Sequence, residues 1–211
     1  PAQLIRETQE DKKLGLKETP PEPNFSAIME RMRNYIQRRV NNKRKFFKEH
    51  SNVDYYSGVA EFVNPRTLEI NDKRISSEKI LLCLGSEPFV PNIKGLDKIT
   101  YHTNKTIVNM KHLPESILFV GGGFIAIEFG HFFAAMGSEV TIVEYNDRIL
   151  GPAEPEISHV AHNELEEHLT IVLNHQVSEF QQLDDGNIRV VAKSRNDDKK
   201  KRIEAQEVFL A

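Results

Sequence analysis

A glycine-rich run at residues 121–126 carries the residue types and spacing of a dinucleotide-binding loop. Its sequence, GGGFIA, fits the pattern G-x-G-x-x-A, and Glu144 follows 23 residues after the first glycine. In this pattern Gly121 permits a tight turn, Gly123 lets the backbone approach a pyrophosphate, and the small Ala126 lets a helix pack closely on a strand. A helix starting after the glycines would direct free N–H groups and its positive dipole end at the phosphates. Glu144 would then accept hydrogen bonds from the adenosine ribose hydroxyls. We therefore predict a dinucleotide site here, against the alternative of a glycine turn that serves only close packing.

The elements around this run predict an α/β fold with a parallel sheet. Apolar strand patterns alternate with helical patterns through short connections, which is typical of parallel strands covered by helices. The predicted order is strand 117–120, helix 124–136, strand 140–144, helix 155–168 and strand 170–173. Runs 176–182 and 188–194 then flank an Asp-Asp-Gly-Asn turn and predict a hairpin, and a last strand follows the charged stretch 197–202. The glycine run thus lies where a buried strand gives way to a helix.

The first hundred residues follow a different pattern. Residues 1–24 are polar and end in prolines at 20, 21 and 23, which predicts a loop. A helix capped by Asn24 or Ser26 follows, with one apolar face and many basic residues. Period-two runs then predict an antiparallel meander of strands at 53–56, 59–63, 67–70 and 79–84. A proline-containing connector, 88–95, leads to the second region.

Composition excludes several classes of protein. The 211 residues carry 28 basic and 31 acidic side chains, a net charge of −3, so the basic helix is better explained as a solvated face than as a nucleic-acid site. The longest apolar run is shorter than the roughly 20 residues of a membrane span. The single cysteine, Cys83, excludes an intramolecular disulfide and favours a cytoplasmic setting, and we expect it to be a small core side chain. The eight histidines show no metal-ligand pattern.

Four segments resemble one enzyme family. Residues 120–130, VGGGFIAIEFG, and 136–144, MGSEVTIVE, closely resemble the nicotinamide-binding domain of the flavin-dependent disulfide reductases, the class I pyridine nucleotide-disulfide oxidoreductases. This family includes dihydrolipoamide dehydrogenase, glutathione reductase, mercuric reductase and mycothione reductase. Residues 82–88, LCLGSEP, resemble its Ala-Thr-Gly-Ser-x-Pro segment, and 57–62, SGVAEF, its Gly-x-Ala-x-Phe strand. The resemblance implies part of a FAD-binding domain over 1–105 and a Rossmann-like NAD-binding domain over 106–211.

The resemblance also implies roles for individual residues. Phe124 falls where glutathione reductase has a tyrosine that shields the flavin, with core packing as the alternative, and Glu128 would lie near the nicotinamide carboxamide. Because Glu128 follows apolar residues, we also expect it to need a partner that offsets its desolvation. Leu84 stands where the family usually has threonine, which removes a hydroxyl from that position. The implied NAD-binding residues are Gly121, Gly122, Gly123, Phe124, Ile125, Ala126, Ile127, Glu128, Glu144 and Val177, and the implied FAD-binding residues are Gly58, Ala60, Leu84, Gly85 and Ser86.

Other family motifs are not found in these 211 residues. They are the first G-x-G-x-x-G for FAD, the C-x-x-x-x-C redox pair and the carboxyl-terminal His/Glu pair. We therefore expect these residues to be a middle fragment of a longer, homodimeric enzyme, and we expect the fragment to contain no catalytic residues. In the intact enzyme, hydride would pass between NAD(H) and FAD, and electrons to a disulfide, with NADP(H) disfavoured by Glu144. The alternatives are a related reductase whose acceptor is mercuric ion or oxygen, and a dinucleotide-sensing module without redox chemistry.

Overall fold

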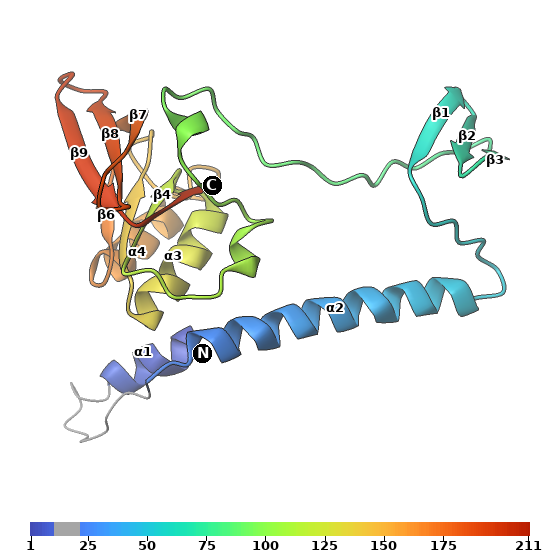
Figure 1. Cartoon of the computed structure of the whole chain (residues 1–211), viewed down its shortest axis with the longest axis horizontal. Helices are drawn as coiled ribbons and strands as arrows, with labels where there is room; N and C mark the ends of the chain where they lie inside the picture. Colours follow the sequence, from blue (N-terminus) through green and yellow to red (C-terminus); the bar gives the residue numbers. More distant parts are fainter. Residues whose placement is uncertain (11–21) are drawn as a thin grey trace. The chain divides into compact units, whose positions relative to one another are not determined.

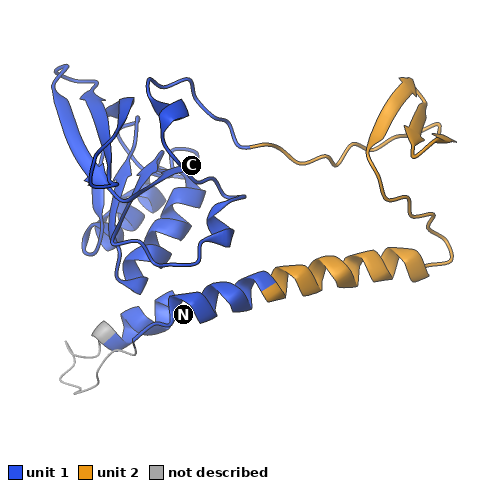
Figure 2. Cartoon of the chain, in the orientation of Figure 1, with its two compact units in different colours: residues 1–33, 88–211 blue, residues 34–87 orange. Residues whose placement is uncertain are grey.

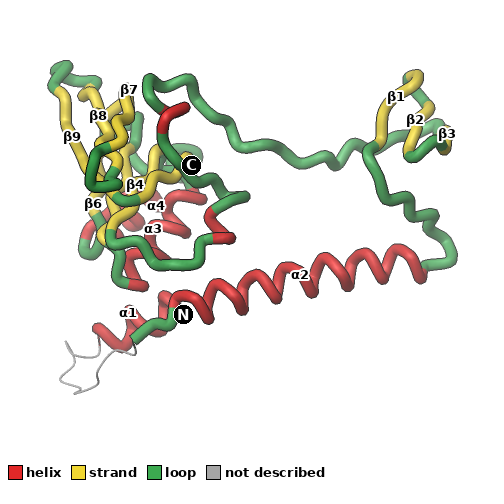
Figure 3. Tube along the Cα trace, in the orientation of Figure 1, coloured by secondary structure: helices red, strands yellow, loops and turns green. Residues whose placement is uncertain are grey.

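The strand–helix alternation predicted after residue 116 forms a four-stranded parallel sheet in the computed structural model, which describes residues 1–10 and 22–211 (Figures 1 and 3). Each neighbouring pair in the sheet is parallel. The alternation predicts this for three of the strands, and the fourth, residues 207–210, adds a parallel pair that was not predicted. Two helices follow the strands in sequence, α3 (Phe124–Met136) and α4 (Pro155–Glu166). In spatial order the strands are β10 (Glu207–Leu210), β4 (Ser116–Val120), β5 (Glu139–Val143) and β6 (Thr170–Val172). The α/β fold class predicted from the sequence is confirmed.

The two faces of this sheet are buried against different partners. Successive strand residues point to opposite faces, so β4 contributes Ile117 and Phe119 to one core and Leu118 to the other. The first core includes the helical residues Ala126 and Phe133, and the second is completed by an antiparallel sheet. Burial on both faces explains why the parallel strands are continuous apolar runs.

That antiparallel sheet contains three strands. They are β7 (His175–Gln182), β8 (Ile188–Ser194) and β9 (Lys200–Ala205), paired in this order. The predicted hairpin corresponds to β7 and β8, and Gly186 occupies the left-handed region in its turn at φ +90°. The prediction that a strand follows the charged stretch 197–202 is wrong about where it starts, because Lys200–Arg202 of that stretch already pair with β8 as the start of β9.

The amino-terminal segment corrects another prediction. Residues 2–10 form a helix, α1 (Ala2–Glu10), whose Ile5 is buried in the helical core, whereas the sequence predicted a polar loop. Of the three prolines behind that prediction, those at 20 and 21 lie outside the described residues. The second helix, α2 (Phe25–Glu49), begins as predicted, since Asn24 Oδ1 accepts a hydrogen bond from Ala27 N at 2.9 Å. No helix among the described residues is both long enough and apolar enough to cross a bilayer.

The described chain divides into two compact units, residues 1–33 with 88–211 and residues 34–87 (Figure 2). The first unit also contains two short 3-10 helices, η2 (Leu96–Lys98) and η3 (Ile107–Asn109). The second unit contains an antiparallel sheet of β1 (Ala60–Asn64), β2 (Thr67–Ile70) and β3 (Lys73–Ser76). The domain division 1–105 and 106–211 stays a prediction.

Two of the strands predicted for this meander do not form. Asn71 and Asp72 both have positive φ, 49° and 64°, so β2 turns back at once onto β3 and not onto 79–84. Residues 53–56 and 79–84 are not in strands, and Leu84 is 85% exposed. Cys83 is exposed as well, so its expected place in a core is wrong. The apolar pattern of 79–84 needs a neighbouring strand, and the described residues supply none.

Candidate functional site

The first glycine of the loop is required by a close backbone approach. Gly121 follows β4 with φ +103°, and its N–H donates to Val143 O of β5 at 2.8 Å. A Cβ atom there would lie 2.9 Å from Ala211 O. Both the backbone angle and the available space therefore select glycine, as expected for the tight turn.

The second glycine, Gly122, is packed against two residues of the chain that follows β5. A Cβ atom on Gly122 would lie 3.0 Å from Glu144 Oε2 and 3.0 Å from Ile149 Cγ2. Its carbonyl oxygen accepts a hydrogen bond from Leu150 N at 2.8 Å. Gly122 thus joins the loop to the chain that follows β5, a role the G-x-G-x-x-A pattern does not specify.

The third glycine opens onto free space. A Cβ atom on Gly123 would have no heavy atom within 4 Å, and its φ of −77° is ordinary, so neither packing nor backbone geometry demands glycine here. Gly123 is the N-cap of α3 and makes no side-chain cap, and the first helical bond runs from Ile127 N to Gly123 O at 3.1 Å. The first N–H groups of α3 therefore have no helical acceptor and can bind an anion. Glycine at this position fits a ligand that approaches the backbone.

Ala126 and Gly130 bring α3 close to the sheet. Ala126 is fully buried, and a Cβ atom on Gly130 would lie 3.3 Å from Ile142 Cδ1 of β5. This close packing is the expected role of the small residue at the end of the motif. It holds the amino terminus of α3 at the carboxyl end of β4.

Glu144 follows the last residue of β5 and is 7% exposed. Its Oε2 accepts a hydrogen bond from Gly122 N at 2.5 Å, and its Oε1 accepts bonds from Asn146 N and Asn146 Nδ2, both at 2.7 Å. Three donors compensate for the burial of this carboxylate. The sequence predicted only a contact with the ribose, whereas the structure shows that Glu144 also holds the glycine loop in place.

The side chains at the start of α3 point outward. Phe124 is 57% exposed, which contradicts the alternative of core packing and leaves its proposed shielding of the flavin as a prediction. Ile125 is exposed as well, while Ile127 packs against the helical core. Glu128 is also exposed, so the expectation that its burial demands a partner is wrong. The residues next to Glu128 in sequence are apolar, but Glu128 lies on the exposed face of the helix.

Val177 lies in β7, next to a bulge. Its side chain is buried in the second core, and the pairing with β8 shifts register between Val177 and Glu179. A contact between Val177 and an adenine would therefore be made by the backbone. The role of this residue stays a prediction.

The predicted FAD-binding residues lie in the second unit on two separate segments. A Cβ atom on Gly58 would lie 2.7 Å from Asn71 Oδ1, so packing against Asn71 already accounts for glycine at this position. Gly85 has φ +70° and open space around it. Ala60, Leu84 and Ser86 are exposed. None of these observations identifies a ligand, and the FAD roles stay predictions.

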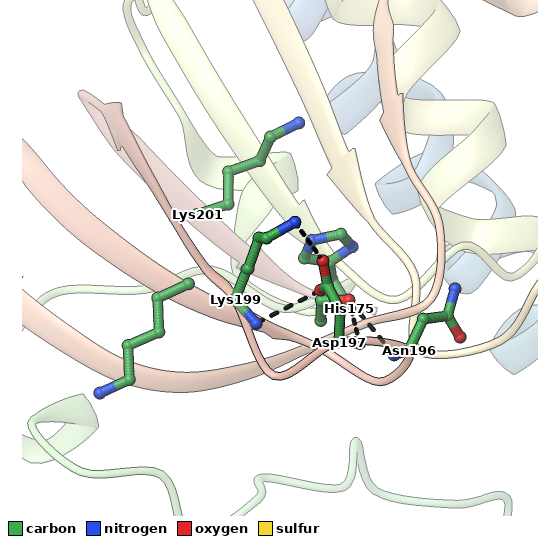
Figure 4. A pocket seen from close by; sticks show the side chains of 7 residues that line it. His175, Asn196, Asp197, Lys199 and Lys201 are labelled. Atoms are coloured by element: carbon green, nitrogen blue, oxygen red, sulfur yellow. Dashed lines mark hydrogen bonds and ion pairs between the residues drawn. The ribbon is translucent and has the colours of Figure 1, made fainter.

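An open pocket of about 450 Å³ lies at one end of the antiparallel sheet, apart from the glycine loop. In Figure 4 the side chains of Asp197 and Lys199 point toward one another within it, and their ion pair measures 2.7 Å. The hydrogen bond from Lys199 lowers the pKa of Asp197 to about 2. The charges of Asp197 and Lys199 are thus paired with each other within the protein. Among the described residues, no group of three or more histidine, cysteine, aspartate or glutamate side chains is arranged to hold a metal ion.

Comparisons with known proteins identify the same relatives that the motifs suggest. The chain is 29% identical over 156 residues to mercuric reductase from Lysinibacillus sphaericus, covering 74% of this chain and 29% of that protein. It is 30% identical over 138 residues to dihydrolipoyl dehydrogenase from Acholeplasma laidlawii, covering 64% and 41% respectively. The chain therefore spans less than half the length of these relatives.

A solved structure shares the fold. The HOCl-induced flavoprotein disulfide reductase RclA from Escherichia coli superposes with a TM-score of 0.77 and 24% identity, covering 99% of this chain and 44% of that one. The family model described as pyridine nucleotide-disulphide oxidoreductase matches residues 2–211. With this match over nearly the whole length, the chain belongs to the pyridine nucleotide-disulphide oxidoreductase family.

Proposed function

We propose that this chain binds NAD(H) on the loop between β4 and α3 and is part of a flavin-dependent disulfide reductase similar to dihydrolipoamide dehydrogenase. The observation that carries the proposal is the environment of Gly123, where a glycine that packing does not require stands in front of uncapped helical N–H groups. A pyrophosphate fits this arrangement because it needs close backbone approach and several N–H donors. In the whole enzyme the nicotinamide would supply the hydride that is exchanged with FAD.

The residues of this chain would position the cofactor. The N–H groups at the start of α3 would bind the pyrophosphate, and Glu144 would hold the loop while facing the adenosine ribose. Phe124, exposed in the first turn of α3, would cover the flavin until the nicotinamide arrives. Glu128, one turn further along α3, would meet the carboxamide.

We further propose a preference for NAD(H) over NADP(H). A 2′-phosphate near the Glu144 carboxylate meets a like charge, which costs about 4 kcal/mol per unit-charge pair at ~4 Å and an effective dielectric of ~20 before screening. Arg148 could offset this cost, but its guanidinium donates to Ala153 O at 2.9 Å and to Gly151 O at 2.7 Å. We expect NADH to bind at least tenfold more tightly than NADPH in titrations at one fixed ionic strength. Equal or tighter binding of NADPH would contradict this preference.

The substitution Gly123→Ala tests the site itself. The added Cβ atom meets no protein atom and φ is ordinary, so the free energy of unfolding should change by less than about 1 kcal/mol. The same atom would stand between the backbone and the pyrophosphate, so the dissociation constant for NADH should rise at least tenfold. Calorimetric titration and chemical unfolding of the same samples separate the two effects. Unchanged NADH affinity, or no NADH binding to the unsubstituted chain, would contradict the proposed function.

The electron acceptor is a separate question. Relatives named mercuric reductase match as much of this chain as those named dihydrolipoyl dehydrogenase, so mercuric ion is a second candidate acceptor. We propose a cytoplasmic homodimer with a disulfide substrate, on the family membership and the single cysteine of the chain. Oxidation of NADH by the full-length enzyme with lipoamide, mercuric ion or oxygen as the only acceptor decides among them.

A further inference from the structure

A guanidinium group lies on the ring of Tyr145, the residue that follows Glu144. Arg195 Cζ is 3.8 Å from the centroid of the Tyr145 ring, and Arg195 Nη1 donates to Tyr145 O at 3.2 Å. Both side chains are exposed. A cation over an aromatic face at this distance is attracted by the ring. Arg195, which lies 50 residues after Tyr145, is therefore held against the end of β5.

Backbone hydrogen bonds determine where Arg195 stands. Its N–H donates to Asn174 O at 2.8 Å, and Asn174 N in turn donates to Asn146 O at 2.8 Å. His175 N donates to Glu144 O at 3.0 Å. The turn after β8, the corner between β6 and β7 and the residues after β5 are thus joined by main-chain contacts. The position of Arg195 beside residues 144–146 follows from the fold and not from one flexible side chain.

The charge of Arg195 is not neutralised by its own turn. Asp197 is paired with Lys199 at 2.7 Å, as Figure 4 shows, and Asp198 is paired with Lys193 at 2.8 Å. Among the described residues, no carboxylate lies within ion-pair distance of Arg195, and its hydrogen bond to Tyr145 O uses one of the several N–H donors of a guanidinium. The remaining donors are free for an anion.

We infer that Arg195 is a specificity-determining residue that contacts the 2′ position of the adenosine ribose. This inference rests on the proposed function, because it assumes that the ribose lies at Glu144. A 2′-phosphate there would meet the carboxylate of Glu144 and also the guanidinium of Arg195, which offsets part of the repulsion. Arg195 thus reduces the preference for NAD(H) over NADP(H). Arg148 does not contribute in this way, because its guanidinium is bound to backbone carbonyl groups.

The substitution Arg195→Ala tests this assignment. The dissociation constant for NADPH should rise roughly tenfold, the size expected from one charge-assisted contact at an exposed site, and that for NADH should change less than twofold. The ratio of the two constants should therefore increase roughly tenfold. The pair 2′,5′-ADP and 5′-AMP, which differ only in the 2′-phosphate, should show the same change. Arg195→Lys should lie between the two proteins, because it keeps the charge and loses the planar stacking.

A matched control removes the same charge elsewhere. Arg189 lies on β8 and is paired with Glu204 at 2.8 Å, so Arg189→Ala should leave the NADPH to NADH ratio unchanged. If Arg195→Ala weakens both dinucleotides equally, Arg195 only supports the fold near Tyr145, and the assignment is wrong while the proposed function stands. If the unsubstituted chain binds neither dinucleotide, the proposed function fails and this assignment fails with it.

Discussion

Glu144 should stabilise the glycine loop even when no cofactor is bound, and the substitution Glu144→Gln measures this contribution. Glutamine keeps the size of the side chain but replaces one carboxylate oxygen by an amide nitrogen, which cannot accept a hydrogen bond. In either orientation a donor, Gly122 N or the two donors of Asn146, then faces an NH2 group. The loop therefore loses at least one bond to a charged acceptor.

The magnitude follows from these three contacts. A hydrogen bond to a charged group contributes about 1.5–3 kcal/mol, and a neutral one about 1 kcal/mol. Losing the Gly122 bond and converting both Asn146 bonds from charged to neutral gives a loss of about 2.5–7 kcal/mol. Chemical unfolding at pH 7 measures the total decrease in the free energy of unfolding. Hydrogen exchange at the Gly122 amide shows whether this decrease arises in the loop. Affinity for NADH should fall because the loop is loosened, whereas affinity for NADPH should fall less, because glutamine no longer repels the 2′-phosphate.

The control lies on the same strand. Glu139 begins β5, is exposed, and makes no side-chain hydrogen bond among the described residues, so Glu139→Gln should change the free energy of unfolding by less than about 0.5 kcal/mol. If Glu144→Gln and Glu139→Gln are equally stable and Gly122 exchanges at the same rate in both, the carboxylate does not hold the loop. Its effect on NADH binding would then arise at the ribose alone.

Three further predictions concern the surroundings of the loop. Phe124→Ala should lower the free energy of unfolding by less than about 1 kcal/mol, not the ~3–5 kcal/mol of a core phenylalanine, and should change the flavin reduction rate of the full-length enzyme in stopped-flow experiments; unchanged kinetics would exclude shielding. Ala126→Leu should destabilise the chain by about 1–3 kcal/mol because the residue is fully buried between α3 and the sheet, and an unchanged unfolding midpoint would contradict this packing. Burial, with the nearby charge of Arg6 and the ring of His131, lowers the pKa of His168 to about 4 from 6.5, so its neutral form stabilises the fold above pH 6.5 and this stabilisation is lost as the pH falls toward 4. The full pKa shift corresponds to roughly 3 kcal/mol, and to about 1–2 kcal/mol after allowing for partial exposure. In urea unfolding from pH 7 to 4.5, the free energy of unfolding should depend less on pH for His168→Gln than for the unsubstituted chain. Equal pH dependence in the two proteins would contradict this prediction.

The parallel sheet and the glycine loop could be predicted from the sequence because their signals are local. The strands of the parallel sheet are short apolar runs, α3 and α4 follow β4 and β5 in sequence, and the loop lies between the first such pair. The start and end of α3, Phe124 and Met136, agree with the prediction, since glycine residues flank the helix at 123 and 137. Where the deciding contact lies within one turn or one loop, residue types are sufficient evidence.

The errors occur where the deciding contact is distant in sequence. The helical turns of α1 were not predicted because, among its residues whose burial is described, only Ile5 is buried. One buried residue is too weak an apolar pattern to distinguish a helix from a polar loop. The run 79–84 has a clear strand pattern and no strand in the described chain, because a pattern specifies a face and not the neighbour that must pair with it. Local pattern therefore predicts what a segment can form, and tertiary contacts decide what it does form.

The same distinction applies within the candidate site. Glu144 was predicted from its spacing in sequence after Gly121. Its hydrogen bond to Gly122, however, depends on the pairing of β4 with β5, which places the two strand ends side by side. Arg195 has no motif at all, because only the antiparallel sheet brings its turn to Tyr145. A motif can identify the residues that bind the phosphates shared by both dinucleotides. The discrimination that we propose at the ribose would depend on charges that several distant segments bring to one place, so it must be derived from the folded chain.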